Sequence, residues 1–240
     1  GVIMGKTVTT EFAYMDPPPT LNPWDSECTP GGSSSGSAVG VAAEIFPIAL
    51  GTQTAGSVVR PASYNGVVGF KPTFGLISRY GIMPFAWSLD TVGVFGTWVD
   101  DVIVAFEQLA KFDKRDSSSV EIASGGDICK RTLKGIGVMP ELIGMADEET
   151  RNNFLKIINK LSDDGVSITE IDSGVDIHDL LHAHRIVMSS EVASLHKDIF
   201  KSEFENYGSN IRNLIEIGMV TSSVHYIKSQ RLRNKFVSGM

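Results

Sequence analysis

Serine hydroxyls and flexible backbone gather in the stretch GGSSSGSAVG, where residues 31–40 hold four serines and four glycines. A second stretch, TAGS, places Ser57 directly after Ala55 and Gly56, 24 residues beyond Ser33. A serine on a tight turn can act as a nucleophile while successive backbone N–H groups of the turn hold an oxyanion. The two stretches together favour acyl-transfer chemistry with a serine nucleophile.

A serine nucleophile needs a base, and the histidines are poorly placed to supply it. All of them lie far downstream in helix-like sequence, and Val59 replaces the second glycine of a G-x-S-x-G elbow. The five histidines are His178, His182, His184, His196 and His225. Lysine is the alternative, since Ser–Lys variants of the triad exist and a desolvated lysine loses its proton near neutral pH.

Three other interpretations of these residues fit less well. A flexible linker would not be followed by the apolar AVGVAA, so a turn that leads into a helix capped by Ser35 or Ser37 is expected instead. The first residues, GVIMGKT, are one residue short of the spacing in a phosphate-binding loop. His178 and His182 have the i, i+4 spacing of metal ligands without a third ligand, so no metal is expected.

The elements that must position the serines fall into two kinds of sequence. Up to about residue 100, short apolar runs between glycines and prolines predict buried strands joined by ordered turns. Beyond it, DDVIVAFEQLAKF predicts a helix that begins near Asp100 or Asp101, and DEETRNNFLKIINKLSDDG a helix that ends at Gly165. GIGVMPEL and VSITEID predict strands, and residues 177–236 are mostly helical in pattern. The expected class is α/β.

Composition limits the partners and the compartment. The chain is 42% hydrophobic with a formal net charge of −7, which argues against a general nucleic-acid surface. The longest apolar stretch is interrupted by Glu44 and Pro47 and is too short for a membrane span. Two cysteines, Cys28 and Cys129, without a C-x-x-C pattern fit a cytoplasmic protein.

Three segments resemble the amidase signature enzymes: NPWDSECTPGGSSSGSAVGVAA, ALGTQTAGSVVRPASYNGVVGFKPTFGLISRYG and SLDTVGVFGTWVDD. The resemblance is dense over residues 1–105, the signature core, and looser over residues 106–240, which correspond to the family's more variable α/β and helical part. It implies a single, partial amidase domain over residues 1–240. The implied fold is a mixed, twisted central sheet covered by helices on both faces and incomplete at both ends.

The family uses a Ser–cis-Ser–Lys triad. The resemblance implies that Ser57 is the nucleophile and that Ser33, after a non-prolyl cis peptide bond, is the bridging serine. It assigns the oxyanion hole to the backbone of Thr54, Ala55 and Gly56, with the N–H of Ser57. The lysine would take a proton from Ser33 and Ser33 one from Ser57, which attacks the amide carbonyl to form an acyl-serine without a cofactor.

The catalytic lysine of the family lies several dozen residues before the glycine-serine stretch, outside this sequence. Lys6 corresponds to a position near the pocket wall, and Lys71 to a structural position, so neither is assigned as the base. We therefore expect the sequence to be the central piece of a protein nearly twice as long. Produced alone, such a piece would lack its base and be inactive.

The residues around Ser57 favour one branch of the family. Gln53, Ala55 and Val59 resemble free-standing amidases more than the tRNA-dependent amidotransferases, whose A chain is the family member. This implies hydrolysis of a small-molecule amide, without nucleic acid or membrane as a direct partner, and leaves a homodimer open. In malonamidase-like members an arginine at the place of Arg60 binds a substrate carboxylate, and a structural bond to backbone carbonyls is the alternative.

Two other functions stay open at this point. The first is the glutaminase component of a tRNA-dependent amidotransferase, which releases ammonia from glutamine for a partner handling charged tRNA. The second is a non-catalytic or truncated module with a binding role. Among the remaining residues, Asp90 corresponds to a structural position. Trp24, Trp87 and Trp98 are expected to pack in the core, and the lining of an apolar pocket is the alternative.

Overall fold

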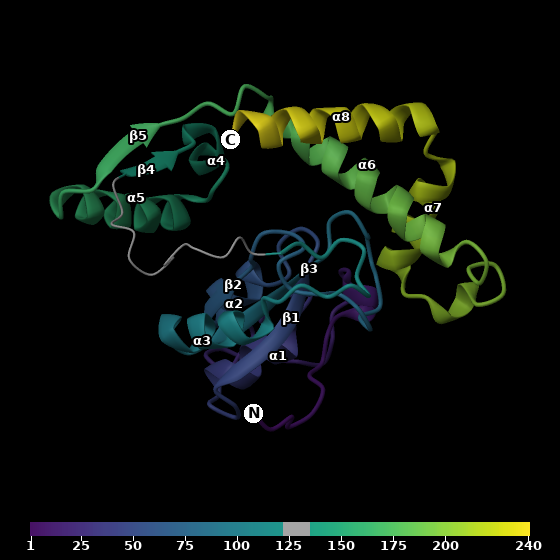
Figure 1. Ribbon diagram of the computed structural model, residues 1–240, viewed down its shortest axis with the longest axis horizontal. Helices are drawn as coiled ribbons and strands as arrows, with labels where there is room; N and C mark the ends of the chain where they lie inside the picture. The colour runs from purple at the N-terminus through teal and green to yellow at the C-terminus, as the bar shows by residue number, and fades with distance from the viewer. Residues whose placement is uncertain (122–134) are drawn as a thin grey trace. The chain divides into compact units, whose positions relative to one another are not determined.

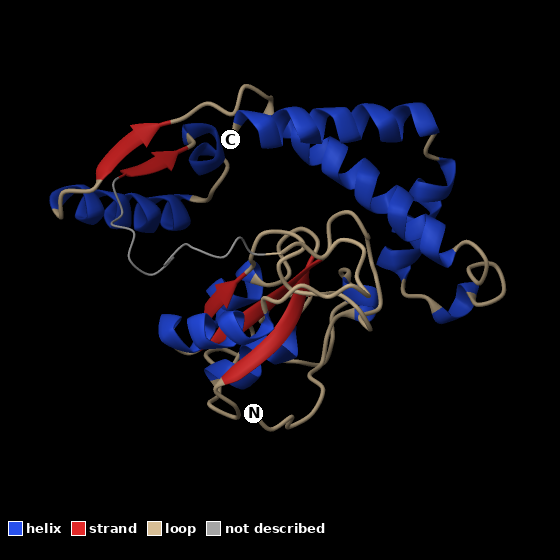
Figure 2. Cartoon of the chain, viewed as in Figure 1, coloured by secondary structure: helices blue, strands red, loops and turns tan. Residues whose placement is uncertain are grey.

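The computed structural model describes residues 1–121 and 135–240, whose helices and strands are shown in Figures 1 and 2. In chain order the elements are η1 (Glu11–Ala13), α1 (Ser35–Ala42), β1 (Ile48–Gln53), α2 (Val59–Asn65), β2 (Val68–Phe70), β3 (Thr91–Gly96), α3 (Val99–Leu109), β4 (Gly135–Val138), α4 (Pro140–Gly144), α5 (Glu148–Asp163), β5 (Ser167–Glu170), α6 (Ile177–His196), η3 (Phe204–Asn206), α7 (Ser209–Val220) and α8 (Ser223–Gly239). The described residues fall into two compact units, residues 1–121 with 188–221 and residues 135–187 with 222–240. The mixture of helices and strands confirms the predicted α/β class.

A three-stranded antiparallel sheet lies in the first unit, in the order β1-β3-β2. All six residues of the central strand β3 are buried. Leu50 of β1 and Phe70 of β2 both pair with Val94 of β3. At the carboxyl end of β1, Gln53 pairs with Thr91, so β1 delivers the chain directly into the TAGS turn.

Helices cover both faces of this sheet. Successive residues of β3 point to opposite sides, so Val94 and Phe95 lie in different cores. Phe95 belongs to a hydrophobic core shared with α1 and α2, whose other buried members are Ala38, Val41, Ala49, Val58 and Ala62. Val94 belongs to a second core shared with α3, whose other buried members are Ile77, Val92, Val102 and Ala105. The helix predicted from DDVIVAFEQLAKF is confirmed as α3, and the Asp101 carboxylate accepts the Trp98 N–H at 3.0 Å at its start.

The beginning of α1 differs from the expectation. Ser34 is the N-cap residue and makes no side-chain capping bond, whereas Ser35 and Ser37 lie inside the helix, so the caps predicted at these two positions were wrong. The physical reason is close packing of small side chains against β1. The Ser37 hydroxyl donates to the Leu50 carbonyl at 2.7 Å, and a Cβ on Gly51 would lie 2.5 Å from the Ser34 Oγ.

A third core joins residues 188–221 to the loop before β3. Phe85 and Ala86 pack against buried residues of α6 and α7, among them Met188, Val192, Ala193, Ile211, Leu214 and Ile215. The Glu191 carboxylate accepts the Ser88 N–H at 2.9 Å and the Ser88 hydroxyl at 2.6 Å. The end of α6 therefore fixes the loop that contributes Phe85 and Trp87 to the pocket described below.

The second unit contains the parallel pair β4–β5, in which Ile136 pairs with Ile168. α5 begins at a cap in which the Asp147 carboxylate accepts the Thr150 N–H at 2.8 Å, and it ends just before Gly165. Both predicted strands and the predicted helix are confirmed. Within the described ranges, no helix combines the length and the apolar character required to cross a bilayer.

The three tryptophans are exposed, so the expectation that they pack in the core was wrong. Trp24 and Trp98 are each 71% exposed and Trp87 is 55% exposed. The indole N–H of Trp24 donates to the Asn65 carbonyl at 2.8 Å, and that bond holds the ring at the surface. Trp87 lines a pocket, as its second interpretation allowed.

Candidate active site

The fold brings together the two stretches that carry the candidate serines. Ser33 lies immediately before α1, and Ser57 lies in the turn between β1 and α2. The N–H of Ser34 donates to the Ser57 carbonyl at 3.3 Å, so the two backbones are in direct contact. Ser33 is 1% exposed and Ser57 is 7% exposed.

Ser33 is held by its backbone while its hydroxyl stays unpaired. The peptide bond between Gly32 and Ser33 is cis, at the place that the family resemblance indicated. The Ser33 carbonyl accepts the Thr10 N–H at 3.1 Å and the Thr9 hydroxyl at 2.9 Å. The Ser33 Oγ is buried without a hydrogen-bond partner among the described residues, which typically costs about 1–3 kcal/mol. A buried hydroxyl of this kind is suited to exchange protons with a group that reaches it.

Gln53, the last residue of β1, organises the turn that carries Ser57. Its Oε1 accepts the N–H groups of Val58 at 2.8 Å and Val59 at 3.0 Å, where α2 begins. Its Nε2 donates to the Ala55 carbonyl at 2.9 Å. One neutral amide therefore satisfies three backbone groups of the turn.

The same turn exposes a row of free donors. Within the described chain, the N–H groups of Ala55, Gly56 and Ser57 make no hydrogen bond to the protein. Successive unpaired N–H groups in a turn form a concave site for an anion or an oxyanion. All three residues belong to the stretch, residues 54–57, whose N–H groups the resemblance assigned to the oxyanion hole.

Thr54, the remaining residue so assigned, connects the turn to the wall of a pocket. Its hydroxyl donates to the Asp90 carboxylate at 2.6 Å. The same carboxylate accepts the N–H groups of Phe85 at 2.7 Å and Ala86 at 3.0 Å, and Asp90 is 7% exposed. These bonds give Asp90 a structural function, in line with the position that it occupies in the motif SLDTVG.

Arg60 reaches from α2 back to the glycine-serine stretch. Its Nε donates to the Gly32 carbonyl at 3.0 Å, next to the cis bond. A Cβ added to Gly56 would lie 4.0 Å from the Arg60 Cζ, so the guanidinium sits beside the row of free donors. The bond to Gly32 is of the structural kind, and it uses one of the five N–H donors that a guanidinium carries.

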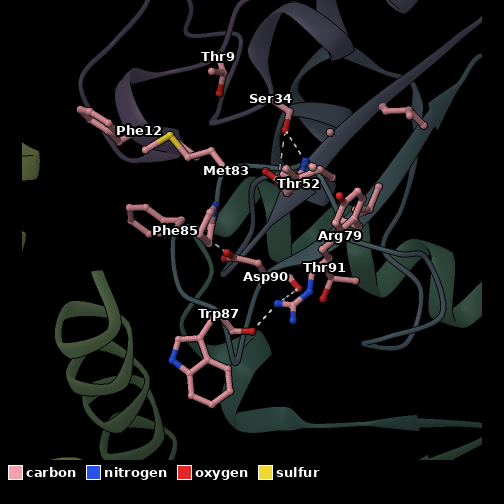
Figure 3. A pocket seen from close by; sticks show the side chains of 18 of the residues that line it. Thr9, Phe12, Ser34, Thr52, Arg79, Met83, Phe85, Trp87, Asp90 and Thr91 are labelled. Atoms are coloured by element: carbon pink, nitrogen blue, oxygen red, sulfur yellow. Dashed lines mark hydrogen bonds between the residues drawn. The ribbon is translucent and has the colours of Figure 1, made fainter. Parts of the chain in front are cut away.

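A pocket of about 690 Å³ opens on the first unit (Figure 3). Aromatic and apolar side chains form part of its lining, among them Phe12, Met83, Phe85 and Trp87. Ser34 and Thr52, joined by hydrogen bonds of 3.3 Å, and Asp90 also line it. Ser33 and Ser57 are not in the lining, although Ser34 is the neighbour of the first. The pocket thus adjoins the serine pair.

Arg79 is a residue of this wall that sequence reasoning missed. Its guanidinium donates to the carbonyls of Trp87 and, at 3.2 Å, of Asp90, and to the Ser118 hydroxyl at 2.6 Å. Its Nε lies 3.8 Å from the Asp116 carboxylate. The sequence did hold a signal for Arg79, since Lys71 and Arg79 are the sole positively charged residues between residues 61 and 100.

The two lysines lie where the resemblance placed them. Lys6 lines the pocket. The Nζ of Lys71 donates to the Pro72 carbonyl at 2.6 Å, and burial lowers the pKa of its ammonium group. Neither lysine is hydrogen-bonded to the Ser33 hydroxyl, which has no partner in the described part of the chain.

Metal-ligating side chains and cysteines are the other candidates for a reactive centre among the residues described. No group of three or more metal-ligating side chains is found there. Cys28 is a free, exposed thiol whose pKa is raised by its hydrogen bond to Asp25, while Cys129 lies outside the described residues. A raised pKa lowers the thiolate fraction at neutral pH, so Cys28 is a poor nucleophile.

The sheet covered by helices and the two buried serines at adjoining turns define an α/β protein built around a serine-rich site. Within that class the chain belongs to the Amidase family, whose profile matches residues 1–237.

The relatives of the chain include both enzyme types that the sequence left open. The glutamyl-tRNA(Gln) amidotransferase A chain from Chlamydia felis is 34% identical over 276 residues and is matched by 100% of this chain. The structure of its counterpart from Thermotoga maritima is 31% identical with a TM-score of 0.79 and is matched by 99% of this chain. A structure described as an amidase is 28% identical with a TM-score of 0.78 and is matched by 92% of this chain.

The chain spans about half the length of these relatives. It covers 55% of the Chlamydia felis protein, 54% of the Thermotoga maritima chain and 49% of the amidase.

Proposed function

We propose that the protein containing this chain hydrolyses the C–N bond of a small carboxamide through an acyl-enzyme on Ser57. One observation carries the proposal. Among the described residues, the Ser33 hydroxyl has no hydrogen-bond partner and lies next to a turn that holds Ser57 and three free N–H groups. Membership of the Amidase family supports it.

In the proposed reaction each group has one task. Ser57 attacks the amide carbonyl and passes its proton to Ser33, which passes its own to a basic group. The N–H groups of Ala55, Gly56 and Ser57 receive the negative charge that develops on the carbonyl oxygen, and losing one such donor costs about 2.7–4 kcal/mol. The basic group and Ser33 return a proton to the leaving amine, and water then hydrolyses the acyl-serine to the acid.

The resemblance assigns the basic group to a lysine outside these 240 residues. A neutral lysine with a lowered pKa can accept the proton of Ser33, whose buried hydroxyl has no competing partner among the described residues. All kinetic tests below therefore use the full-length protein.

Ammonia release from butyramide and succinamic acid tests the proposal. Replacing Ser57→Ala removes the nucleophile and is expected to lower kcat by at least about 10³-fold. Replacing Ser33→Ala interrupts proton transfer and is expected to lower kcat by about 10²- to 10⁴-fold. Ser63→Ala, an exposed serine of α2, is the matched control and should retain activity. Wild-type kcat in the Ser57 variant would refute the proposal.

The second candidate is the glutaminase component of a tRNA-dependent amidotransferase, and the similarity to the Chlamydia felis protein favours it. In that case the same serines would release ammonia from glutamine for a partner protein. Glutamine hydrolysis that depends on a co-purifying partner would support this candidate. Against it stand Gln53, Ala55 and Val59, which resemble free-standing amidases.

A further inference from the structure

We infer that Gln53 is a positioning residue that shapes the oxyanion turn, and that both the carbonyl and the NH₂ of its amide are required. The inference rests on the proposed function, because it concerns how the same turn supports catalysis. It does not depend on the serine hydroxyls, since the three hydrogen bonds from the Gln53 side chain to the turn all go to backbone groups.

The contacts of Gln53 span the turn from both ends. At one end the Nε2 binds the Ala55 carbonyl at 2.9 Å, and at the other the Oε1 binds the N–H groups of Val58 and Val59. Gln53 is 6% exposed, so water does not replace these bonds easily. Its backbone pairs with Thr91 in the sheet, which fixes the point from which the side chain reaches out.

The direction of these bonds matters for the free donors. Gln53 binds the Ala55 carbonyl and satisfies the N–H groups of Val58 and Val59. The N–H groups of Ala55, Gly56 and Ser57 are left without a protein partner in the described chain. Without the Gln53 amide, the Ala55 carbonyl and the first N–H groups of α2 would need new partners. The turn would then rearrange, and a displacement of about 1 Å can cost on the order of 10² in rate.

A carboxylate in this place would be chemically different. It could accept both N–H groups, but it could not donate to the Ala55 carbonyl, which would face a negative oxygen. Once protonated, the same carboxyl regains an O–H donor for the carbonyl. The inference therefore predicts a particular pH dependence for one variant.

The experiment compares Gln53→Glu and Gln53→Met in the full-length protein, with ammonia release from butyramide between about pH 5.5 and 8.5. Both variants are expected to lose about 10- to 100-fold in kcat near pH 8 with KM changed less than about 3-fold. The ratio of kcat to wild type should rise as pH falls for Gln53→Glu, because the introduced carboxyl becomes protonated. It should stay flat for Gln53→Met, which has no polar side-chain atom to titrate.

A second measurement does not depend on activity. Hydrogen exchange of the backbone amides of Val58 and Val59 should be slow in the wild type and markedly faster in Gln53→Met, with exchange in the strands of the sheet unchanged. If the wild type hydrolyses none of the amides tested, the proposed function fails, while the exchange result still decides the positioning of the turn.

Several results would overturn the inference. Unchanged exchange at Val58 and Val59 in Gln53→Met, or wild-type kcat in that variant, would show that the amide does not hold the turn. A pH-independent ratio for Gln53→Glu would show that the donor to Ala55 is dispensable. Failure of both variants to fold would assign Gln53 to the stability of the whole unit instead of the position of one turn.

Discussion

At the scale of single residues, Arg60 touches both stretches that carry the serines. Its Nε binds the Gly32 carbonyl, and its guanidinium lies beside Gly56. The group is exposed and keeps further N–H donors, which can form a charge-assisted, bidentate pair with a carboxylate. We propose that Arg60 selects substrates that carry an acid group while it supports the backbone at Gly32.

Replacing Arg60→Ala separates these two functions. Loss of the bond to Gly32 should lower kcat for charged and neutral amides alike. Loss of a charge-assisted contact should in addition raise KM for succinamic acid by about 10- to 100-fold, with little change for butyramide. Steady-state kinetics on the two amides measures the difference. Equal losses on both amides would limit Arg60 to its backbone contact.

The sequence singled out Ser57 by its turn and Ser33 through the family resemblance, but it did not indicate the side chains that support the two stretches. The bridging bonds of Gln53 and Arg79 could not be predicted, since their partners are backbone groups that become neighbours only when the chain folds.

At the scale of elements, α6 and α7 pack closely where Gly218 meets the preceding helix. A Cβ on Gly218 would lie 2.0 Å from the Ser189 carbonyl oxygen and 2.6 Å from the Ala193 Cβ. Both neighbours lie in the part of α6 whose core also holds Phe85 of the pocket wall. The helix pair is therefore tied to the geometry of the pocket.

Replacing Gly218→Ala should force the helices apart and destabilise the protein by about 1–3 kcal/mol. Gly144→Ala in α4 is the matched control, because no atom lies within 4 Å of its added Cβ. The control should be neutral or gain up to about 1 kcal/mol from the lower backbone entropy of alanine. Thermal unfolding measures both. A melting temperature of the Gly218 variant at or above that of the wild type would contradict the close packing.

Periodicity predicted the elements that follow residue 98 well, because α3 and α5 have clear amphipathic patterns and β4 and β5 are short apolar runs beside turns. The start of α1 was predicted wrongly, since serine suits both a cap and a tightly packed helix interior. The tryptophans were misplaced because periodicity does not indicate tertiary contacts such as the bond from the Trp24 indole to the Asn65 carbonyl.

At the scale of the whole molecule, the site lies within one of two compact units. The first unit combines the signature stretches with residues 188–221, which are distant in sequence. Local patterns predicted the α/β class, yet they could not predict that α6 and α7 return to support the pocket wall. That return depends on contacts such as the one from Glu191 to Ser88.

The central claim is that Ser57 is the nucleophile, and covalent labelling of the full-length protein tests it most directly. A fluorophosphonate forms a stable bond with an activated serine oxygen, and peptide mass spectrometry then locates the adduct. The account predicts a single adduct on Ser57, absent from Ser57→Ala and formed much more slowly in Ser33→Ala. An adduct on a different serine, or none in a protein that hydrolyses amides, would contradict it.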